Sequence, residues 1–485
     1  MDTKVEHTKN EIVMDEEANR EGSSFRSEDD DFHYSDEEKR LVRKISWTLL
    51  PLIWCIVFVQ FVDKSIMSVA AVTGLFEDTH INKSQYSWAS SVIYLGYLVY
   101  QVPNNILIQR LPHAKYLGVL IFLWGVVVAA TCVVDSFQQL MGVRFLLGLF
   151  EAGTNPILYI ILNALYRRSE QSSVFGFILI SSGSGSSIGA AIGYGIVQTL
   201  DYKNGWRAWR WSYLIFGICT TVLGVIVFFL LIDTPTSKLL RLTETEQAIV
   251  KKRTEDNKVI KSKTIKKEQI WEAFKEARFW CLNLAVLFNA MENGGMLSYA
   301  VILVQGLGFN SQEAILLNIP SGMASVLFIC IAIYLARRSN QTIYTSIGMT
   351  GVSLIGLIVL MANESNGGKL AGYYLTWALT AAQAMMITII GNNVSGYTKK
   401  VTYNSGLVVF NTLGNFIGPL VMANSFMVGL IVYIVGSVIS AILLLYIRWN
   451  MLHINNQRKD QRLGEKTDPS LDYTDRQDVN FVYRL

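Results

Sequence analysis

Residues 144–156 read Arg-Phe-Leu-Leu-Gly-Leu-Phe-Glu-Ala-Gly-Thr-Asn-Pro and place two ionisable side chains inside an apolar run. Arg144 and Glu151 are seven residues apart, about two turns of helix, so both side chains are expected to leave from nearly one face. A charge at the centre of a membrane span costs about 2.5–3.5 kcal/mol on insertion scales, and such residues therefore face a bundle interior or a wet cavity. The stretch predicts part of a solute pathway. A structural ion pair that locks two helices is the alternative.

The composition predicts an all-α membrane protein. Of the 485 residues, 51% are hydrophobic and only 16% are charged, whereas a soluble protein carries about 25% charge. Long uncharged runs recur along the chain, and a bilayer accepts helices because they satisfy their own backbone groups. The five cysteines lie in apolar segments without paired spacing, which argues against a disulfide framework and a zinc site.

Apolar runs long enough to span a bilayer form two sets of six. The first set covers 44–72, 86–108, 116–135, 139–161, 174–198 and 211–232. The second set covers 279–304, 312–335, 342–361, 371–393, 403–424 and 427–449. The predicted organisation is an acidic disordered tail (1–43), an N-terminal half (44–232), a polar loop (233–278), a C-terminal half (279–449) and a polar tail (450–485).

The two sets of spans echo one another. Asn82-Lys83-Ser84-Gln85 opens the second span and Asn310-Ser311-Gln312-Glu313 opens the eighth, both as polar helix caps. The fifth and eleventh spans carry small residues four positions apart, which let helix backbones approach closely in lipid; these are Gly185, Gly189 and Gly193, and Gly414 and Gly418. The repetition predicts two pseudo-symmetric six-helix halves, an architecture typical of transporters.

The basic residues of the short loops set the expected orientation. Cytoplasmic loops are enriched in Lys and Arg, and with the N-terminus inside, the inner loops hold Arg110, Lys115, Arg167, Arg168, Arg337, Arg338, Lys399 and Lys400. Both termini are therefore expected in the cytoplasm of a multi-pass protein. We expect the plasma membrane, with the endoplasmic reticulum membrane as the alternative, and a monomer whose partners are the lipid bilayer and a small organic anion, without nucleic acid.

The end of the polar loop has an amphipathic pattern. Ile270, Trp271 and Phe274 recur at helical spacing among charged residues. Two placements fit this pattern: a helix that lies on the inner leaflet, and a linker helix packed on the bundle.

Few other ionisable or polar side chains lie deep in the spans. Asp63 and Lys64 follow an uncharged run in the first span, and Glu292 lies between Asn289 and Asn293 in the seventh. Lys64 and Arg144 are candidates for binding an anion through charge-assisted hydrogen bonds. Asn155, Asn289 and Asn293 are candidates for further polar contacts to the substrate.

The carboxylates outnumber the cations in this set. The candidates for proton coupling are Glu151, Asp63 and Glu292. Because three carboxylates face two cations, at least one lacks an obvious partner and is suited to bind and release a proton. The alternatives are that Asp63 is a helix-packing partner and that Glu292 lies at a wet pore edge.

The positions of the other reactive residues argue against an enzyme. All five histidines lie in tails or loops, so the spans offer no buried nucleophile–histidine pair. The sequence has no glycine-rich phosphate loop followed by Lys and Ser or Thr, which argues against ATP-driven pumping. We expect no cofactor; a proton is the expected coupling ion.

Several motifs resemble the major facilitator superfamily, specifically the fungal allantoate permease branch of anion:cation symporters. In the second span they are Tyr94-Leu95-Gly96-Tyr97, Pro103-Asn104-Asn105 and Arg110-Leu111-Pro112, and in the third Trp124-Gly125. The most specific match is Arg144, Gly148, Glu151-Ala152 and Pro156, followed by Tyr166-Arg167-Arg168-Ser169-Glu170-Gln171. Asp233, Pro235 and the segment from Gly414 to Pro419 extend the similarity over nearly all the membrane domain.

This resemblance implies roles for three residues. In related animal transporters of anions the matching arginine engages the substrate and the matching glutamate is tied to proton coupling, which implies these roles for Arg144 and Glu151. The resemblance also implies the role of the first-span cation for Lys64, at a position where the branch usually has arginine. Lysine does not offer the same planar fork to a carboxylate.

The residues and the resemblance together predict a proton-coupled symporter that imports a small carboxylate-bearing nutrient, such as an allantoate-, vitamin- or amino-acid-like organic anion. Alternating access between the two halves would move the solute. Two alternatives remain at this stage: a nutrient sensor without flux, and a proton-driven antiporter of another solute class.

Overall fold

The computed structural model describes residues 35–234, 237–256, 266–423, 425–459 and 472–485. The acidic tail expected at the N-terminus falls mostly on residues 1–34, outside the described residues. The described chain begins with Ser35, whose hydroxyl accepts a hydrogen bond from the Glu38 amide and caps the first helix. That helix starts at Asp36, earlier than the expected residue 44.

The N-terminal half consists of the helices from α2 to α9. Its elements are α2 (Asp36–Ala70), η1 (Ala71–Leu75), α3 (Phe76–Thr79), α4 (Lys83–Arg110), α5 (His113–Ala130), η2 (Thr131–Val133), α6 (Phe137–Glu151), α7 (Thr154–Leu165), α8 (Arg168–Leu200), η3 (Lys203–Gly205) and α9 (Ala208–Leu230). The connecting segment contains η4 (Lys238–Leu240), α10 (Glu244–Asp256) and α11 (Lys267–Lys275).

The C-terminal half consists of the helices from α12 to α19. Its elements are α12 (Ala277–Ser298), α13 (Ala300–Gly306), α14 (Ser311–Ser339), α15 (Thr342–Ala362), α16 (Asn366–Thr376), α17 (Ala378–Asn393), α18 (Tyr397–Met422) and α19 (Phe426–Arg458). The last of these continues beyond the expected end at residue 449.

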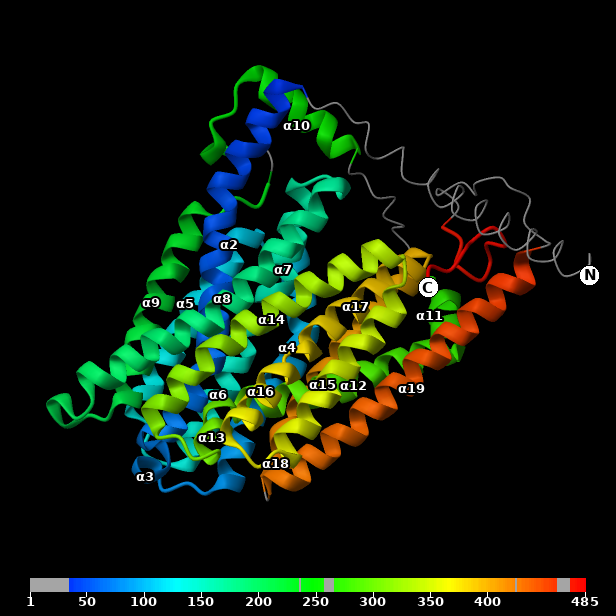
Figure 1. The fold of residues 1–485 in the computed structure, drawn as a ribbon. Helices are drawn as coiled ribbons and strands as arrows, with labels where there is room; N and C mark the ends of the chain where they lie inside the picture. The colour runs from blue at the N-terminus through cyan, green and yellow to red at the C-terminus, as the bar shows by residue number, and fades with distance from the viewer. Residues whose placement is uncertain (1–34, 235–236, 257–265, 424, 460–471) are drawn as a thin grey trace, which may run out of the picture.

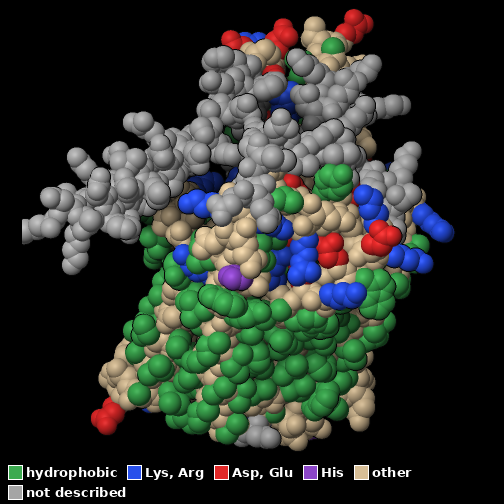
Figure 2. All heavy atoms as spheres, turned by 90° about the vertical axis from the view of Figure 1, so that its right-hand side faces the viewer, with side chains coloured by type: hydrophobic (Ala, Val, Ile, Leu, Met, Phe, Trp, Pro, Cys, Tyr) green, Lys and Arg blue, Asp and Glu red, His purple; other side chains and the backbone are tan. Residues whose placement is uncertain are grey.

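The helices form a membrane bundle of two halves that lie side by side (Figure 1). Ten segments of the described chain are long and apolar enough to cross a bilayer. The more polar α4 and α12 are long helices packed among them and complete the twelve expected spans. Figure 2 shows a continuous apolar band, with Lys, Arg, Asp and Glu side chains gathered beyond one edge of it. Such a band is what a lipid-facing surface requires.

The predicted symmetry of the halves is confirmed at the helix caps. Asn82 accepts a hydrogen bond from the Gln85 amide at 2.9 Å, and the Gln85 side chain accepts one from the Asn82 amide at 3.0 Å. Asn310 and Glu313 form the same reciprocal pair at 2.8 and 3.0 Å. Each pair satisfies backbone amides that the first turn of a helix leaves free.

The glycines of the fifth and eleventh spans make equivalent helix contacts in the two halves. Gly185 lies against the backbone of α2 at Phe58, and Gly414 lies against the backbone of α12 at Leu287. In each half a side chain at the glycine would collide with the first helix of that half. A further close approach, between Gly183 and Gly322, joins α8 to α14 across the two halves.

Hydrogen bonds between the halves gather at one face of the bundle. The start of α2, α10, α11 and residues 472–485 lie at the other face, which we call the terminal face, and the ribbons of the two halves diverge toward it (Figure 1). At the opposite face, the Tyr86 hydroxyl donates to the Ser298 carbonyl at 2.7 Å and the Val301 amide donates to the Ser68 hydroxyl at 2.8 Å. There Ser87 and Tyr299 share a short hydroxyl–hydroxyl contact.

The amphipathic segment forms α11, which packs on the bundle as one of the two expected placements requires. Gln269 and Ala273 are buried, and the helix packs on α18. Trp271 and Phe274 are exposed, although the Phe274 ring also contacts Phe279 of α12. The helix therefore rests on the bundle and leaves two of its aromatic side chains exposed.

Candidate functional site: a buried charge cluster in the N-terminal half

The first pair of ionisable groups joins α2 to α6. Lys64 Nζ lies 3.0 Å from Glu151 Oε1, and Gln60 Nε2 donates to the same oxygen at 2.8 Å. Gln60 and Lys64 are four residues apart on α2, so both side chains leave from one face. Glu151 is completely buried, whereas 18% of the Lys64 side chain is exposed. Lys64 is thus the member of the pair whose side chain keeps some exposed surface.

Arg144 lies on the same helix as Glu151 but binds different groups. Its Nη2 atom donates to Met67 Sδ at 2.9 Å and makes a short contact with the Tyr213 hydroxyl of α9. In the described residues no carboxylate forms an ion pair with this guanidinium, although Arg144 is 97% buried. Its direct partners are therefore neutral, and the carboxylates of Asp63 and Glu151 act on its charge without an ion-pair contact.

Asp63 completes the group of ionisable residues in this half. Its Oδ2 atom accepts a hydrogen bond from the Trp124 indole of α5 at 3.4 Å, and only 2% of the residue is exposed. This contact fits the packing alternative for Asp63 as well as a role in coupling.

Four polar atoms of this cluster have no hydrogen-bond partner among the described residues. They are Gln60 Oε1, Asp63 Oδ1, Arg144 Nε and Glu151 Oε2. Buried polar atoms are nearly always satisfied in folded proteins. These unsatisfied donors and acceptors are therefore available to a further ligand, a water molecule or a proton.

The polar residues expected from the seventh span lie in the other half. Asn289 Nδ2 donates to Gln383 Oε1 of α17 at 3.2 Å and to the Leu379 carbonyl at 3.3 Å. Gln383 in turn donates to Asn411 Oδ1 of α18 at 2.6 Å. Asn293 is half-buried one turn beyond Asn289 on α12. These carboxamides form a chain of neutral donors and acceptors.

Glu292 is not brought to the charge cluster. Its carboxylate accepts hydrogen bonds from the Ser353 hydroxyl of α15 at 2.5 Å and from the Ser437 hydroxyl of α19 at 2.9 Å. Only 1% of the residue is exposed. The carboxylate is thus enclosed by helices of the C-terminal half, which does not match the expectation of a wet pore edge. Asn155 is half-buried at the start of α7.

Sequence reasoning missed several groups that complete the site. Gln60 is one turn before Lys64, so the helical spacing could have shown it. Tyr213, Gln383 and Asn411 come from distant helices, and only the packing of those helices brings them to Arg144 and Asn289. Among the described residues, no group of His, Cys, Asp and Glu is arranged to hold a metal ion.

Comparison with known proteins decides the family. Residues 53–423 match the model of the Major Facilitator Superfamily. The chain belongs to this superfamily. It is 30% identical over 479 residues to the allantoate permease of Saccharomyces cerevisiae, covering 93% of this chain and 87% of that protein. It is 27% identical to a thiamine pathway transporter of the same yeast, over 98% and 89% of the two chains.

Solved structures agree on the fold of this superfamily member. A bacterial homologue of the human lysosomal transporter Spinster, in an inward-facing and occupied conformation, superposes with a TM-score of 0.66 at 13% identity and covers 82% of this chain and 96% of its own. A D-xylose–proton symporter gives a TM-score of 0.61 at 16% identity, over 83% and 96% of the chains. The predicted fold and family are thus confirmed, and the protein is a transporter of the major facilitator type.

Proposed function

We propose that this transporter is a proton-coupled symporter that imports a small organic anion bearing a carboxylate. The observation that carries the proposal is the contact between Lys64 and Glu151, next to the unpaired Arg144 guanidinium. Two cations at the cluster are suited to a carboxylate, and Glu151 competes with that carboxylate for Lys64. The similarity to an allantoate permease supports an organic anion as the class of solute.

The competition for Lys64 provides a mechanism of coupling. When Glu151 is ionised, it neutralises the Lys64 ammonium at 3.0 Å and leaves little charge for a solute. When Glu151 takes up a proton, the ammonium is released and can bind the carboxylate of the solute. Proton binding and anion binding therefore favour one another, which is the thermodynamic requirement for symport.

The remaining polar residues have supporting roles in this proposal. Arg144 presents its open Nε atom to the solute, and Asp63 is a second carboxylate that can exchange a proton beside it. Asn289, Asn293 and Asn155 supply neutral hydrogen bonds to the rest of the solute. Glu292 has no assigned step in this mechanism, because its carboxylate is bound by Ser353 and Ser437 in the C-terminal half.

The arrangement of the halves fits one state of an alternating-access cycle. We place the terminal face in the cytoplasm, following the basic residues of the inner loops. The hydrogen bonds between the halves then lie on the external side, as expected of an inward-facing state. We propose the plasma membrane as the site of import.

Transport into proteoliposomes tests the proposal. The purified protein is reconstituted with an acidic exterior, and uptake of radiolabelled allantoate, nicotinate, pantothenate and biotin is followed together with internal pH. We expect saturable uptake of at least one of these anions, accompanied by internal acidification. Saturable binding without flux would indicate a sensor. Proton-driven efflux of organic cations would indicate an antiporter and overturn the proposal.

A further inference from the structure

Residues 472–485 bind the terminal face of the C-terminal half, centred on one buried carboxylate. Asp475 lies 2.7 Å from Lys399 Nζ of α18 through Oδ1 and 2.8 Å from Arg278 Nη2 of α12 through Oδ2. The Tyr483 hydroxyl donates to Asp475 Oδ2 at 2.6 Å. Asp475 is 1% exposed and Lys399 is completely buried. Residues 472–485 thus contribute a buried carboxylate that pairs with cations of α12 and α18.

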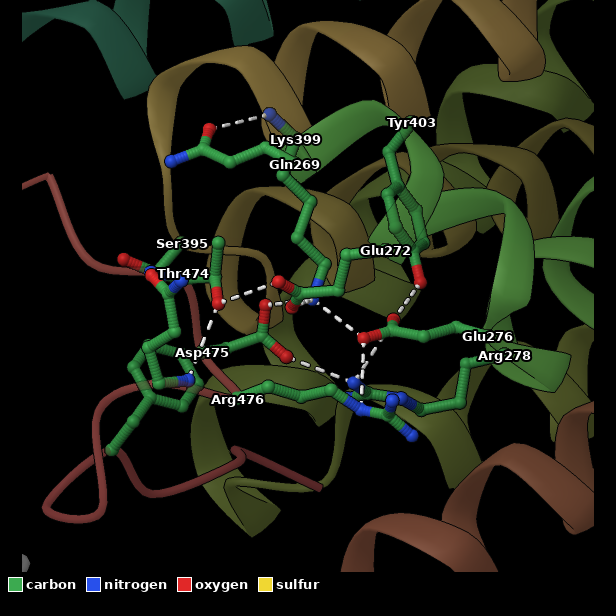
Figure 3. Close-up of polar contacts among 12 residues, drawn as sticks. Gln269, Glu272, Glu276, Arg278, Ser395, Lys399, Tyr403, Thr474, Asp475 and Arg476 are labelled. Atoms are coloured by element: carbon green, nitrogen blue, oxygen red, sulfur yellow. Dashed lines mark hydrogen bonds and ion pairs between the residues drawn. The ribbon is translucent and has the colours of Figure 1, made fainter. Parts of the chain in front are cut away.

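The surrounding ionisable groups make this a network (Figure 3). Lys399 Nζ also binds Glu272 of α11 at 2.8 Å and Glu276 at 2.6 Å. Arg278 binds Glu276 at 3.1 Å. Both Glu276 and Asp475 contact the cations of α12 and α18, and Asp475 does so from residues 472–485, outside the bundle. The neighbouring Thr474 hydroxyl donates to Glu272 of α11 at 3.1 Å, which joins the same segment to α11.

Further hydrogen bonds fix the same segment along its length. At its start, Asp472 binds Lys266 at 2.9 Å and accepts from the Tyr397 amide at 2.6 Å. At its end, Asn393 of α17 exchanges two hydrogen bonds with the backbone of Arg484, at 2.7 and 2.9 Å. Contacts with α19 and α15 complete the set, through Asn455 to Tyr483 and through the Thr342 amide to Leu485.

The N-terminal half has a counterpart with the charges reversed. Arg253 of α10 lies 2.6 Å from Glu38 at the start of α2 and 2.6 Å from Glu170 at the start of α8. Arg167 also binds Glu38, at 3.0 Å. In each half, a segment that follows the sixth span returns to the terminal face and binds the first and fifth spans, with a cation in one half and a carboxylate in the other.

We infer that residues 472–485 form an intramolecular clamp, which ties the terminal-face ends of α12 and α18 to each other and to α11, so that this face of the C-terminal half moves as one body. Without the charge of Asp475, Lys399 keeps Glu272 and Glu276 and Arg278 keeps Glu276. What is lost is the pair of buried ion pairs that join residues 472–485 to α18 and α12. The helix ends that carry Lys399 and Arg278 are therefore expected to loosen when Asp475 loses its charge. The clamp lies outside the charge cluster of α2 and α6 and does not depend on the identity of the solute.

Hydrogen–deuterium exchange of the full-length protein in nanodiscs tests the clamp. We expect Asp475→Asn to speed exchange at least tenfold in residues 472–485 and at the terminal-face ends of α12 and α18, and to leave the opposite face unchanged. Asp36→Asn is the matched control, because Asp36 carries the same charge with a 91% exposed side chain. Faster exchange confined to residues 472–485, or no change at all, would overturn the inference.

A covalent tether separates the clamp from a general loss of folding. The five native cysteines are replaced by alanine, and cysteines are introduced at Asn393 and Arg484, which already lie in contact. We expect the oxidised form to restore protection at the ends of α12 and α18 in the Asp475→Asn protein, and the reduced form to lose it. Tethering that protects only the tail would show that the tail is carried on the surface without clamping the helices.

Discussion

Lys64 Nζ and Gln60 Nε2 both contact one oxygen of Glu151, at 3.0 and 2.8 Å, while the other oxygen of that carboxylate is left without a partner. One oxygen of the carboxylate, Oε1, therefore has two partners, and the other, Oε2, has none. A proton added to the open oxygen would remove the negative charge that holds Lys64 without breaking the Gln60 contact. In the proposed mechanism, substitution of Glu151 is therefore expected to separate anion binding from proton coupling.

Glu151→Gln is expected to uncouple uptake from the proton gradient. The neutral amide resembles a permanently protonated Glu151, so Lys64 stays available to the anion. In proteoliposomes with no gradient we expect anion exchange at rates within about threefold of wild type, and with an acidic exterior no further accumulation. Counterflow of the radiolabelled anion, measured at two external pH values, checks both expectations. Retained acid-driven accumulation would remove Glu151 from the coupling role.

Lys64→Gln is expected to weaken the binding of the anion. A charge-assisted hydrogen bond contributes about 1.5–3 kcal/mol, so the apparent KM should rise about 10- to 100-fold. Lys64→Arg is the matched control, because it keeps the charge and offers a planar fork for the carboxylate. The KM of uptake under a fixed gradient measures the effect. A KM unchanged in Lys64→Gln would contradict direct binding by Lys64.

Glu292→Gln tests whether a second carboxylate takes part in coupling. Its oxygens accept from Ser353 and Ser437 inside the C-terminal half, so we expect proton-dependent uptake to remain within about threefold of wild type. Glu292→Leu leaves the Ser437 hydroxyl without its acceptor, at about 1–3 kcal/mol for a buried group, whereas Ser353 keeps the Thr376 carbonyl at 2.9 Å; the change is expected to lower the melting temperature. Loss of the acid stimulation of uptake in Glu292→Gln would instead assign a coupling role to Glu292.

Much of the fold was predictable because it depends on local patterns. The caps at Asn82 and Asn310 and the small residues at Gly185 and Gly414 follow from the sequence, since each acts within a helix or against a helix of the same half. Arg144 and Glu151 were also correctly expected to be buried on one helix.

The partners of the charged residues were less predictable. Arg144 binds Tyr213 and Met67, and no sequence pattern links α6 to those positions. Glu292 was grouped with the pathway because it shares an apolar run with Asn289 and Asn293, yet a rotation of about 100° per residue along a helix is enough to turn it toward α15 and α19. Residues 472–485 follow a polar stretch, and nothing local in the sequence shows that Asp475 binds Lys399 and Arg278 or that Tyr483 enters the core of the C-terminal half.

Tyr86→Phe is expected to loosen the contact between the halves at the opposite face. The Tyr86 hydroxyl donates to the Ser298 carbonyl, and each lost hydrogen bond contributes about 0.5–1.5 kcal/mol. The equilibrium should shift about two- to tenfold toward a state open at this face. Spin labels at the exposed Ser84 and Glu364, read by double electron–electron resonance, measure the distance between the halves. A distance distribution identical to that of wild type would show that this hydroxyl does not hold the face closed.

The docking of residues 472–485 is expected to depend on pH only in strong acid. Burial alone would raise the pKa of Asp475, but Lys399 and Arg278 beside it outweigh that effect and hold this pKa below its usual value. Further charged or titratable groups of the same network are Glu272, Glu276, Tyr403, Tyr483, Arg458 and Arg476.

Because the pKa of Asp475 is lower in the docked state than in the free state, its contribution to docking is complete above the ordinary aspartate pKa of about 3.9 and is lost as the pH falls through the depressed value. A spin label at Tyr473, whose side chain is exposed, should keep the same restricted motion from pH 8 to about pH 5 and gain mobility only below about pH 4. In Asp475→Asn the label should be mobile at every pH. A mobility change near pH 6 to 7 in the wild type would mean that a group other than Asp475 controls the docking.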